Sequence, residues 1–184
     1  MHKFEEITVK SETIFKGKMI SLQVDEVQLP NGKYSKREMI KHPGAVAILA
    51  ITDDKKIVLV EQYRKPANQA LIEIPAGKLE PGEKPELTAV RELEEETGYR
   101  CEKLEFITSF YTAPGFADEI LHIYKATGLK KLEEPKTADE DEFVELMEVT
   151  LEKAVQLVTE NKICDAKTTF AIQYAQLQEV LNAK

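Results

Sequence analysis

The stretch GKLEPGEKPELTAVRELEEETGY, residues 77–99, joins a glycine-bounded loop to one clearly delimited helix. The helix is predicted over residues 85–97, since Pro85 suits a first helical turn and Gly98 suits the position just past the last. Apolar residues recur in it at helical spacing and predict a face that packs on a core. That predicted apolar stripe consists of Leu87, Val90 and Leu93.

The same helix places four carboxylates within the five positions from Glu92 to Glu96. Glu92, Glu95 and Glu96 are spaced i, i+3 and i+4, so they share one helix face, and like charges at this spacing repel. Converging carboxylates are hard oxygen ligands suited to Mg²⁺ or Mn²⁺, and a bound cation would remove the repulsion. From the acidic run alone, a solvated helix face is the commoner outcome.

Outside this helix, near-continuous apolar runs predict strands that are buried on both faces. Upstream, AVAILAIT (45–52) and KIVLVEQYR (56–64) enclose a turn at Asp53-Asp54. A third strand, LIEIPAG (71–77), is ended by Pro75 and Gly77 and precedes the helix. Further strands are predicted downstream over residues 103–112, 120–127 and 143–149. Two C-terminal helices follow, which Thr150 and Asp165 can cap. The last helix has one predicted apolar face, formed by Phe170, Tyr174, Leu177 and Leu181.

The N-terminal part of the chain is rich in short β-like runs. ITVK, ETIFKG and MISLQVDEVQL precede the turn Pro30-Asn31-Gly32, and a returning strand is expected over residues 34–41. Asn-Gly between alternating segments is a strong hairpin signal. We therefore expect an antiparallel β subdomain over residues 1–42, followed by one larger domain over residues 43–184. The order of elements predicts an α/β (α+β) sandwich with a mixed sheet instead of a βαβ series.

Composition narrows the class of protein further. The chain has 184 residues with a net charge of −8, which disfavours a nucleic-acid-binding surface and suits an anionic substrate that arrives with a divalent cation. No apolar run reaches the roughly 20 residues that a membrane span requires, and the N-terminus has no secretory h-region. The two cysteines are far apart in sequence, which favours free thiols and a cytoplasmic location.

The fixed positions of the opening segment are Gly77, five residues, Glu83, seven residues, Arg91-Glu92-Leu93, one residue, Glu95-Glu96, one residue and Gly98. This arrangement resembles the Nudix box, G-x5-E-x7-R-E-U-x-E-E-x-G-U, where U is a bulky apolar residue. Every fixed position matches, and the mild departure is Tyr99 at a usually aliphatic site. The resemblance implies a Nudix-type α/β/α sandwich and Mg²⁺-dependent hydrolysis of a nucleoside diphosphate linked to another moiety, with Mn²⁺ as the other candidate metal.

The resemblance also assigns roles within the box. Glu92 and Glu96 are the expected metal ligands, together with the carbonyl oxygen of Ala76. Glu95 is expected close to the metal as a catalytic carboxylate. Arg91 resembles the family residue that pairs with a box glutamate and orients it, although a surface i,i+4 pair with Glu95 is an alternative. Glu83 is left open between metal ligand and supporting contact.

Residues outside the box indicate the substrate. Pro114 follows Gly98 by sixteen residues, as in the ADP-ribose pyrophosphatase subgroup, although a plain Pro-Gly turn is an alternative. Ala113 departs from the Ser often found there, and Gly115 completes that loop. Arg64, in EQYRKP, resembles an arginine that contacts substrate phosphate, which suits a guanidinium fork. The remaining predicted substrate contacts are Arg37 and Glu38, at the adenosine end, and Glu73.

The general base is expected outside the box, on the acidic stretch TADEDE (137–142). The spacing of Glu140 and Glu142 resembles a pattern in which the first activates water and the second completes the metal shell. A solvated acidic loop is the alternative.

The resulting hypothesis is an ADP-ribose pyrophosphatase that yields AMP and ribose 5-phosphate. Similar enzymes are dimers, so we expect a homodimer through the N-terminal strands, acting on a nucleotide and binding neither nucleic acid nor membrane. Two alternatives stay open: the same chemistry on a nucleotide sugar or dinucleotide, and a non-catalytic ADP-ribose sensor.

Overall fold

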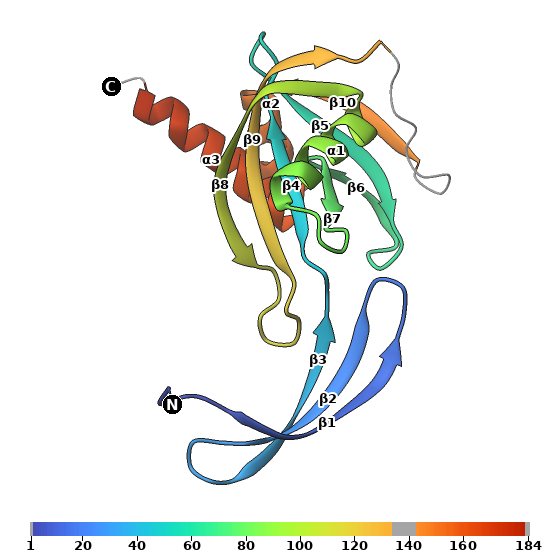
Figure 1. The fold of residues 1–184 in the computed structure, drawn as a ribbon. Helices are drawn as coiled ribbons and strands as arrows, with labels where there is room; N and C mark the ends of the chain where they lie inside the picture. Colours follow the sequence, from blue (N-terminus) through green and yellow to red (C-terminus); the bar gives the residue numbers. More distant parts are fainter. Residues whose placement is uncertain (1, 134–142, 183–184) are drawn as a thin grey trace. The chain divides into compact units, whose positions relative to one another are not determined.

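The computed structural model describes residues 2–133 and 143–182 of the chain. The chain divides into two compact units (Figure 1): unit 1 comprises Met1–Gly44 and Ser109–Leu121, and unit 2 comprises Ala45–Thr108 and His122–Lys184. Within the described residues, no helix combines the length and apolar character needed to cross a bilayer.

Unit 1 is built on a curved, antiparallel three-stranded sheet, drawn in blue in Figure 1. Its strands, in the order β1-β2-β3, are β1 (Ile7–Lys16), β2 (Ser21–Gln28) and β3 (Tyr34–Lys41). The hairpin predicted at Asn31-Gly32 is present, and Gly32 has a φ of +81°, a conformation that glycine adopts without steric cost. The two β-like runs before residue 18 form one strand, β1, which register shifts interrupt.

The loop that carries Pro114 also belongs to unit 1 and bonds to β3. Ile40 N–H donates to the Phe116 carbonyl (2.7 Å), and Asp118 N–H donates to the Ile40 carbonyl (3.1 Å). The Asp118 carboxylate accepts from the His42 N–H at 2.8 Å. These bonds fix the Pro114 loop beside β3, so residues far apart in sequence become neighbours.

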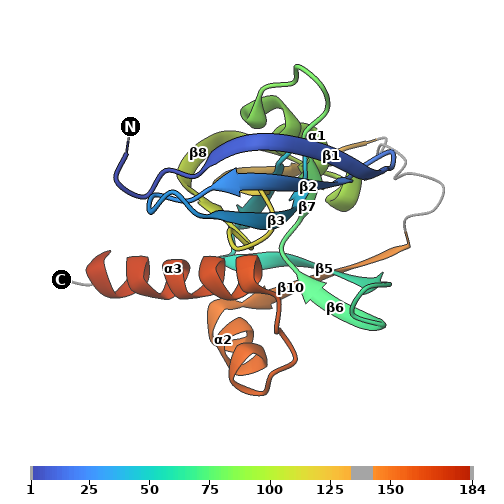
Figure 2. The same cartoon turned by 90° about the horizontal axis from the view of Figure 1, so that it is seen from below.

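Unit 2 contains two further sheets with helices on both sides. One sheet has the order β10-β5-β6 and the other β7-β4-β9-β8. Helix α1 lies on one side of these strands, and α2 and α3 lie on the other (Figure 2), so the expected α+β sandwich is confirmed. The elements are β4 (Ala45–Ala50), β5 (Lys56–Arg64), β6 (Gln69–Glu73), β7 (Ala76–Lys78), α1 (Pro85–Thr97), β8 (Tyr99–Tyr111), β9 (Ile120–Lys131), β10 (Val144–Thr150), α2 (Leu151–Thr159) and α3 (Ala166–Asn182).

The β4 strand is covered on both faces, which explains why its sequence is continuously apolar. Val46, Ile48 and Ala50 are buried in a core shared with α1 residues Ala89 and Leu93. The intervening Ala47 and Leu49 are also fully buried, as expected for a strand covered on both faces.

The strand predicted over residues 71–77 is two strands, β6 and β7, which Ile74 and Pro75 separate. Proline has no N–H to donate to a sheet, and the Pro75 carbonyl instead accepts from the Ile48 N–H at 2.8 Å. The Ile74 N–H donates to the Thr168 hydroxyl of α3 at 2.9 Å. The chain therefore passes from one sheet to the other immediately before residues 77–99.

Helix α1 begins and ends as predicted, with Pro85 in its first turn and Gly98 closing it at a φ of +66°. The predicted apolar stripe is wrong at Leu87, which is 61% exposed. The buried face consists of Thr88, Ala89, Leu93 and Thr97.

The two C-terminal helices are capped as expected. The Thr150 side chain accepts from the Lys153 N–H, and the Asp165 carboxylate accepts from the Thr168 N–H. The predicted apolar face of α3 is wrong at Leu177 and Leu181, which are both more than half exposed. The buried residues of α3 are instead Thr168, Ala171, Ile172 and Ala175.

Candidate active site

The carboxylates of α1 are gathered around one guanidinium. Arg91 Nη1 donates to Glu92 Oε1 at 2.7 Å and to Glu95 Oε2 at 2.8 Å, and its Nη2 donates to Glu83 Oε2 at 3.1 Å. Burial lowers the pKa of Arg91, but the bonds to Glu83 and the neighbouring negative charges outweigh it and leave this pKa raised. Arg91 thus supplies the charge compensation that the acidic run requires, and it does more than form a surface pair with Glu95.

Glu83, which the sequence left open, is a supporting contact of Arg91 in this structure. Its carboxylate also accepts from the Thr88 hydroxyl at 2.9 Å. The bond from Arg91, followed by the bond from Thr88, lowers the pKa of Glu83. The side chain ties the loop before α1 to the second turn of the helix.

Glu92 occupies a space that exists because residue 77 has no side chain. A Cβ added at Gly77 would come within 1.9 Å of the Glu92 carboxyl carbon. The φ of Gly77 is not positive, so close approach and not backbone conformation requires glycine here. The first residue of the box and its central glutamate are therefore one packed unit.

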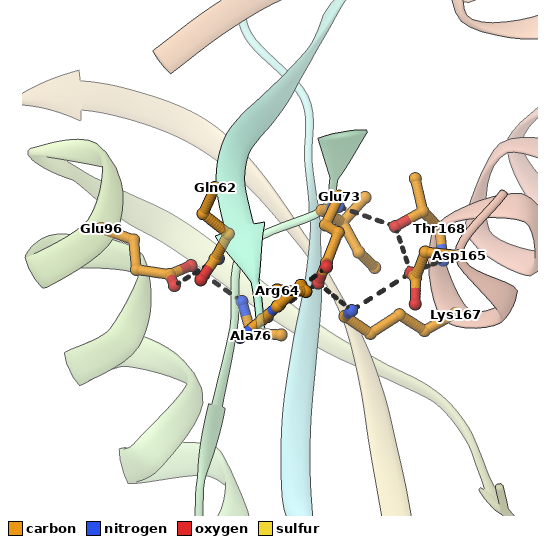
Figure 3. A network of polar contacts seen from close by, with 9 residues as sticks. Gln62, Arg64, Glu73, Ala76, Glu96, Asp165, Lys167 and Thr168 are labelled. Atoms are coloured by element: carbon orange, nitrogen blue, oxygen red, sulfur yellow. Dashed lines mark hydrogen bonds and ion pairs between the residues drawn. The ribbon is translucent and has the colours of Figure 1, made fainter. Parts of the chain in front are cut away.

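Glu96 approaches the same segment from the end of α1. Its Oε2 accepts from the Ala76 N–H at 2.9 Å, and its Oε1 accepts from Gln62 Nε2 at 3.5 Å (Figure 3). Glu96 is therefore close to the Ala76 peptide, whose carbonyl is a predicted metal ligand. Gln62 was not predicted from the sequence, because only its alternation with Arg64 on β5 hints that it shares a face with a functional residue.

These donors suit a hard divalent cation. Glu92 and Glu96 supply carboxylate oxygens beside the glycine space and the Ala76 peptide, and such ligands match Mg²⁺ in type. Among the described residues, no three His, Cys, Asp or Glu side chains already form a metal-binding group.

Arg64 and Glu73, both predicted to contact substrate, form a bidentate ion pair. Arg64 Nε and Nη2 donate to the two oxygens of Glu73, each at 2.8 Å (Figure 3). Burial raises the pKa of Glu73, but the bonds from Arg64 and the charge of Lys167 outweigh it and leave the pKa below its ordinary value. Glu73 is 2% exposed, so it is expected to act on a ligand through Arg64.

Charged residues at the start of α3, which the sequence analysis did not predict, extend the ion pair of Arg64 and Glu73. Lys167 Nζ donates to Glu73 Oε2 and lies 3.1 Å from Asp165 Oδ2. Asp165 is recognisable in sequence as a helix cap, but nothing in the pattern indicates that Lys167 reaches a residue 94 positions earlier.

Four of the predicted substrate contacts are gathered within unit 1. Arg37, Glu38, Pro114 and Gly115 line a hollow of about 330 Å³. Arg37 makes a bidentate pair with Glu6, with bonds of 2.8 and 2.6 Å. The Ala113 carbonyl accepts from the N–H groups of Phe116 and Ala117 and so shapes the loop. Glu140 and Glu142, the predicted base and ligand, lie outside the described residues.

Comparison with known proteins covers almost the whole chain. Residues 41–171 match the NUDIX domain, and residues 6–40 match the nucleoside diphosphate sugar hydrolase N-terminal domain. The chain is 61% identical to an ADP-ribose pyrophosphatase of Bacillus subtilis (strain 168), over 100% of both chains. It is 60% identical to a methanol dehydrogenase activator of Bacillus methanolicus, over 98% of each.

The fold has a counterpart among solved structures. A crystal structure of an ADP compounds hydrolase superposes with a TM-score of 0.82, covering 97% of this chain and 95% of that one. Its sequence identity is 22%, so this likeness shows the fold.

Proposed function

The chain belongs to the NUDIX family, and we propose that it is an Mg²⁺-dependent pyrophosphohydrolase that converts ADP-ribose and water to AMP and ribose 5-phosphate. The observation that carries the proposal is the convergence of Glu92 and Glu96 on the Gly77–Ala76 segment, within a complete box. The full-length identity with an ADP-ribose pyrophosphatase supports the substrate. Mn²⁺ is the alternative cation.

Within unit 2, the proposed roles follow from the contacts. Glu92, Glu96 and the Ala76 carbonyl hold the cation, which when bound neutralises the diphosphate oxygens and lowers the pKa of a water. Arg91 orients Glu92 and Glu95, because it bonds to both. Arg64 binds the diphosphate and is itself held by Glu73.

Within unit 1, Arg37 and Glu38 are proposed to bind the adenosine end, together with the loop of Ala113, Pro114 and Gly115. Their shared hollow supports this assignment, since a loop and a strand distant in sequence both contribute to it. Glu140 remains the proposed base and Glu142 the proposed additional ligand.

The proposed setting is a cytoplasmic homodimer without nucleic-acid or membrane partners, in which residues 1–42 form the dimerisation arm and residues 43–184 the hydrolase domain. Exposed apolar side chains along β1 support pairing through the arm, because such side chains usually mark an interaction surface. They include Ile7, Val9, Ile14 and Phe15, each at least 39% exposed. The net charge of −8 supports the absence of nucleic acid.

The test is product analysis with the purified protein, Mg²⁺ and a substrate panel. The panel consists of ADP-ribose, ADP-glucose, GDP-mannose, NADH and diadenosine polyphosphates. We expect preferred cleavage of ADP-ribose to AMP and ribose 5-phosphate, and loss of turnover with EDTA. Activity centred on another panel member would overturn the substrate and leave the metal chemistry.

A relative of nearly equal identity is called a methanol dehydrogenase activator, so the substrate panel, and not overall similarity, tests the substrate. Binding of ADP-ribose without turnover of any compound would favour the sensor alternative.

A further inference from the structure

The charged residues around Glu73 form a closed set of four that reaches solvent mainly through Arg64. Glu73 is 2% exposed, and the side chains of Lys167 and Asp165 are 13% and 19% exposed. The Arg64 side chain is 39% exposed. Any effect of these four charges on a ligand therefore acts mainly through Arg64.

Arg64 keeps one edge of its guanidinium for a ligand. Its Nε and Nη2 are engaged by Glu73, whereas Nη1 has no hydrogen-bond partner among the residues that the structure describes. The edge formed by Nη1 and the second N–H of Nη2 has the fork geometry that matches phosphate oxygens. The charge of Glu96 also acts on Arg64, which raises the pKa of Arg64 after the larger contribution of the Glu73 bond. Arg64 therefore lies within electrostatic reach of the box carboxylates.

Lys167 determines how much of the positive charge of Arg64 is left for a ligand. With Lys167 in place, two cations and two carboxylates balance to zero; without it, the set carries one net negative charge beside the edge of Arg64. A net negative charge would repel an anionic diphosphate, more strongly in a partly buried place than in water. Asp165 acts with the opposite sign.

The position of Lys167 is fixed by the start of α3. Asp165 accepts from both the N–H and the hydroxyl of Thr168, at 2.9 and 2.6 Å. Thr168 in turn accepts from the Ile74 N–H, next to Glu73 (Figure 3). The helix start and the β6 end are thus joined by a hydrogen bond as well as by charge.

We infer that Lys167 is a positioning residue for substrate binding, which neutralises Glu73 so that Arg64 presents its free edge and its charge to the diphosphate. This inference rests on the proposed function for the identity of the ligand. Lys167 itself touches no substrate in this account.

The test compares Lys167→Gln with the wild type in steady-state kinetics on ADP-ribose. We expect KM to rise about tenfold, equivalent to about 1.4 kcal/mol, while kcat changes by less than about threefold. Lys167→Arg should restore KM.

In an Arg64→Met background, Lys167→Gln should raise KM no further, because Lys167 acts on the ligand through Arg64. Lys162→Gln, at a lysine paired with Glu160 on the surface, is the matched control and should leave both constants unchanged.

Asp165→Asn gives a test with the opposite sign. Asparagine still caps a helix, but it removes one negative charge, so KM should stay the same or fall. If the two residues had a purely structural role, Lys167→Gln and Asp165→Asn would change KM in the same unfavourable direction. A rise in KM for Asp165→Asn would overturn the inference even if Lys167→Gln failed to fold, as would an unchanged KM in folded Lys167→Gln.

The inference and the proposed function can fail separately. If the wild type prefers another diphosphate of the panel, the proposed function fails, and KM is then compared on that substrate. If the wild type hydrolyses nothing, the Kd of ADP-ribose replaces KM. An equal Kd for wild type and Lys167→Gln would refute the inference.

Discussion

The Glu92 carboxyl lies so close to Gly77 that a Cβ at residue 77 would stand 1.9 Å from its carbon. Gly77→Ala must therefore displace the carboxylate, which we expect to lower kcat about 100-fold or more. The unfolding free energy should change little, because the displaced atoms are the far end of a flexible side chain. Kinetics and urea unfolding measure the two effects.

The control for that variant is Gly32→Ala, in the hairpin of unit 1. Gly32 has a φ of +81° and open space around it, so alanine costs about 1–2 kcal/mol in backbone strain. It should lose stability and keep kcat. Equal losses of kcat in both variants would mean that the effect of Gly77→Ala is not specific to the site.

Glu96→Gln separates charge from architecture. The amide oxygen of glutamine can still accept the Ala76 N–H, so the melting temperature should change little. Turnover should fall about 100-fold or more, because a charge beside the proposed cation is removed. Glu94→Gln, on the same helix but outside the proposed ligand set, is the comparison. Wild-type turnover in Glu96→Gln would exclude Glu96 as a ligand.

Arg91→Gln removes the shared partner of Glu83, Glu92 and Glu95. In EDTA we expect the unfolding free energy to fall by about 1.5–3 kcal/mol, which is the size of a hydrogen bond to a charged group. Mg²⁺ should restore part of it, since a cation can replace the missing positive charge. Thermal unfolding with and without Mg²⁺ checks this, with the exposed Arg100→Gln as control. A deficit that Mg²⁺ leaves unchanged would argue against cation binding at these carboxylates.

Tyr99 predicts a response to alkali. Burial, followed by its bond to Glu148 (2.5 Å), raises the pKa of Tyr99 to about 12. The unfolded chain ionises at the ordinary tyrosine pKa of about 10, so the stabilisation is complete below that pH and is lost as pH rises toward 12. Urea unfolding across this range should show the wild type converging on Tyr99→Phe. A constant difference between the two would mean that Tyr99 does not titrate in this window.

Local signals in the sequence were sufficient for the ends of α1. Pro85 and Gly98 act on their own backbone, so the first and last turns follow from residue type alone. The same holds for the Asn31-Gly32 hairpin and the cap at Asp165. Helical spacing also fixes that Glu92, Glu95 and Glu96 share a face, whereas the metal-ligand roles of Glu92 and Glu96 follow from the resemblance to the Nudix box.

Features that depend on distant residues could not be predicted in this way. Leu87 has helical spacing with Val90 but is 61% exposed, whereas the small Ala89 is buried in one cluster with β4 residues. The hydrogen bond from the Ile48 N–H to the Pro75 carbonyl joins residues far apart in sequence, so local signals do not predict it. Lys167 joins the site only because α3 begins beside β6, and that neighbourhood is a property of the whole fold.

The double engagement of Glu73 by Arg64 and Lys167 also limits how this protein can diverge. Replacing either cation alone by a neutral residue leaves the buried carboxylate that they share less well compensated. Substitutions at positions 64, 73 and 167 should therefore be inherited together, with the loss of one charge answered by the loss or relocation of another. In descendants of this chain, a substitution at position 167 in α3 would then accompany a change of substrate preference that began at position 64 or 73 in the strands.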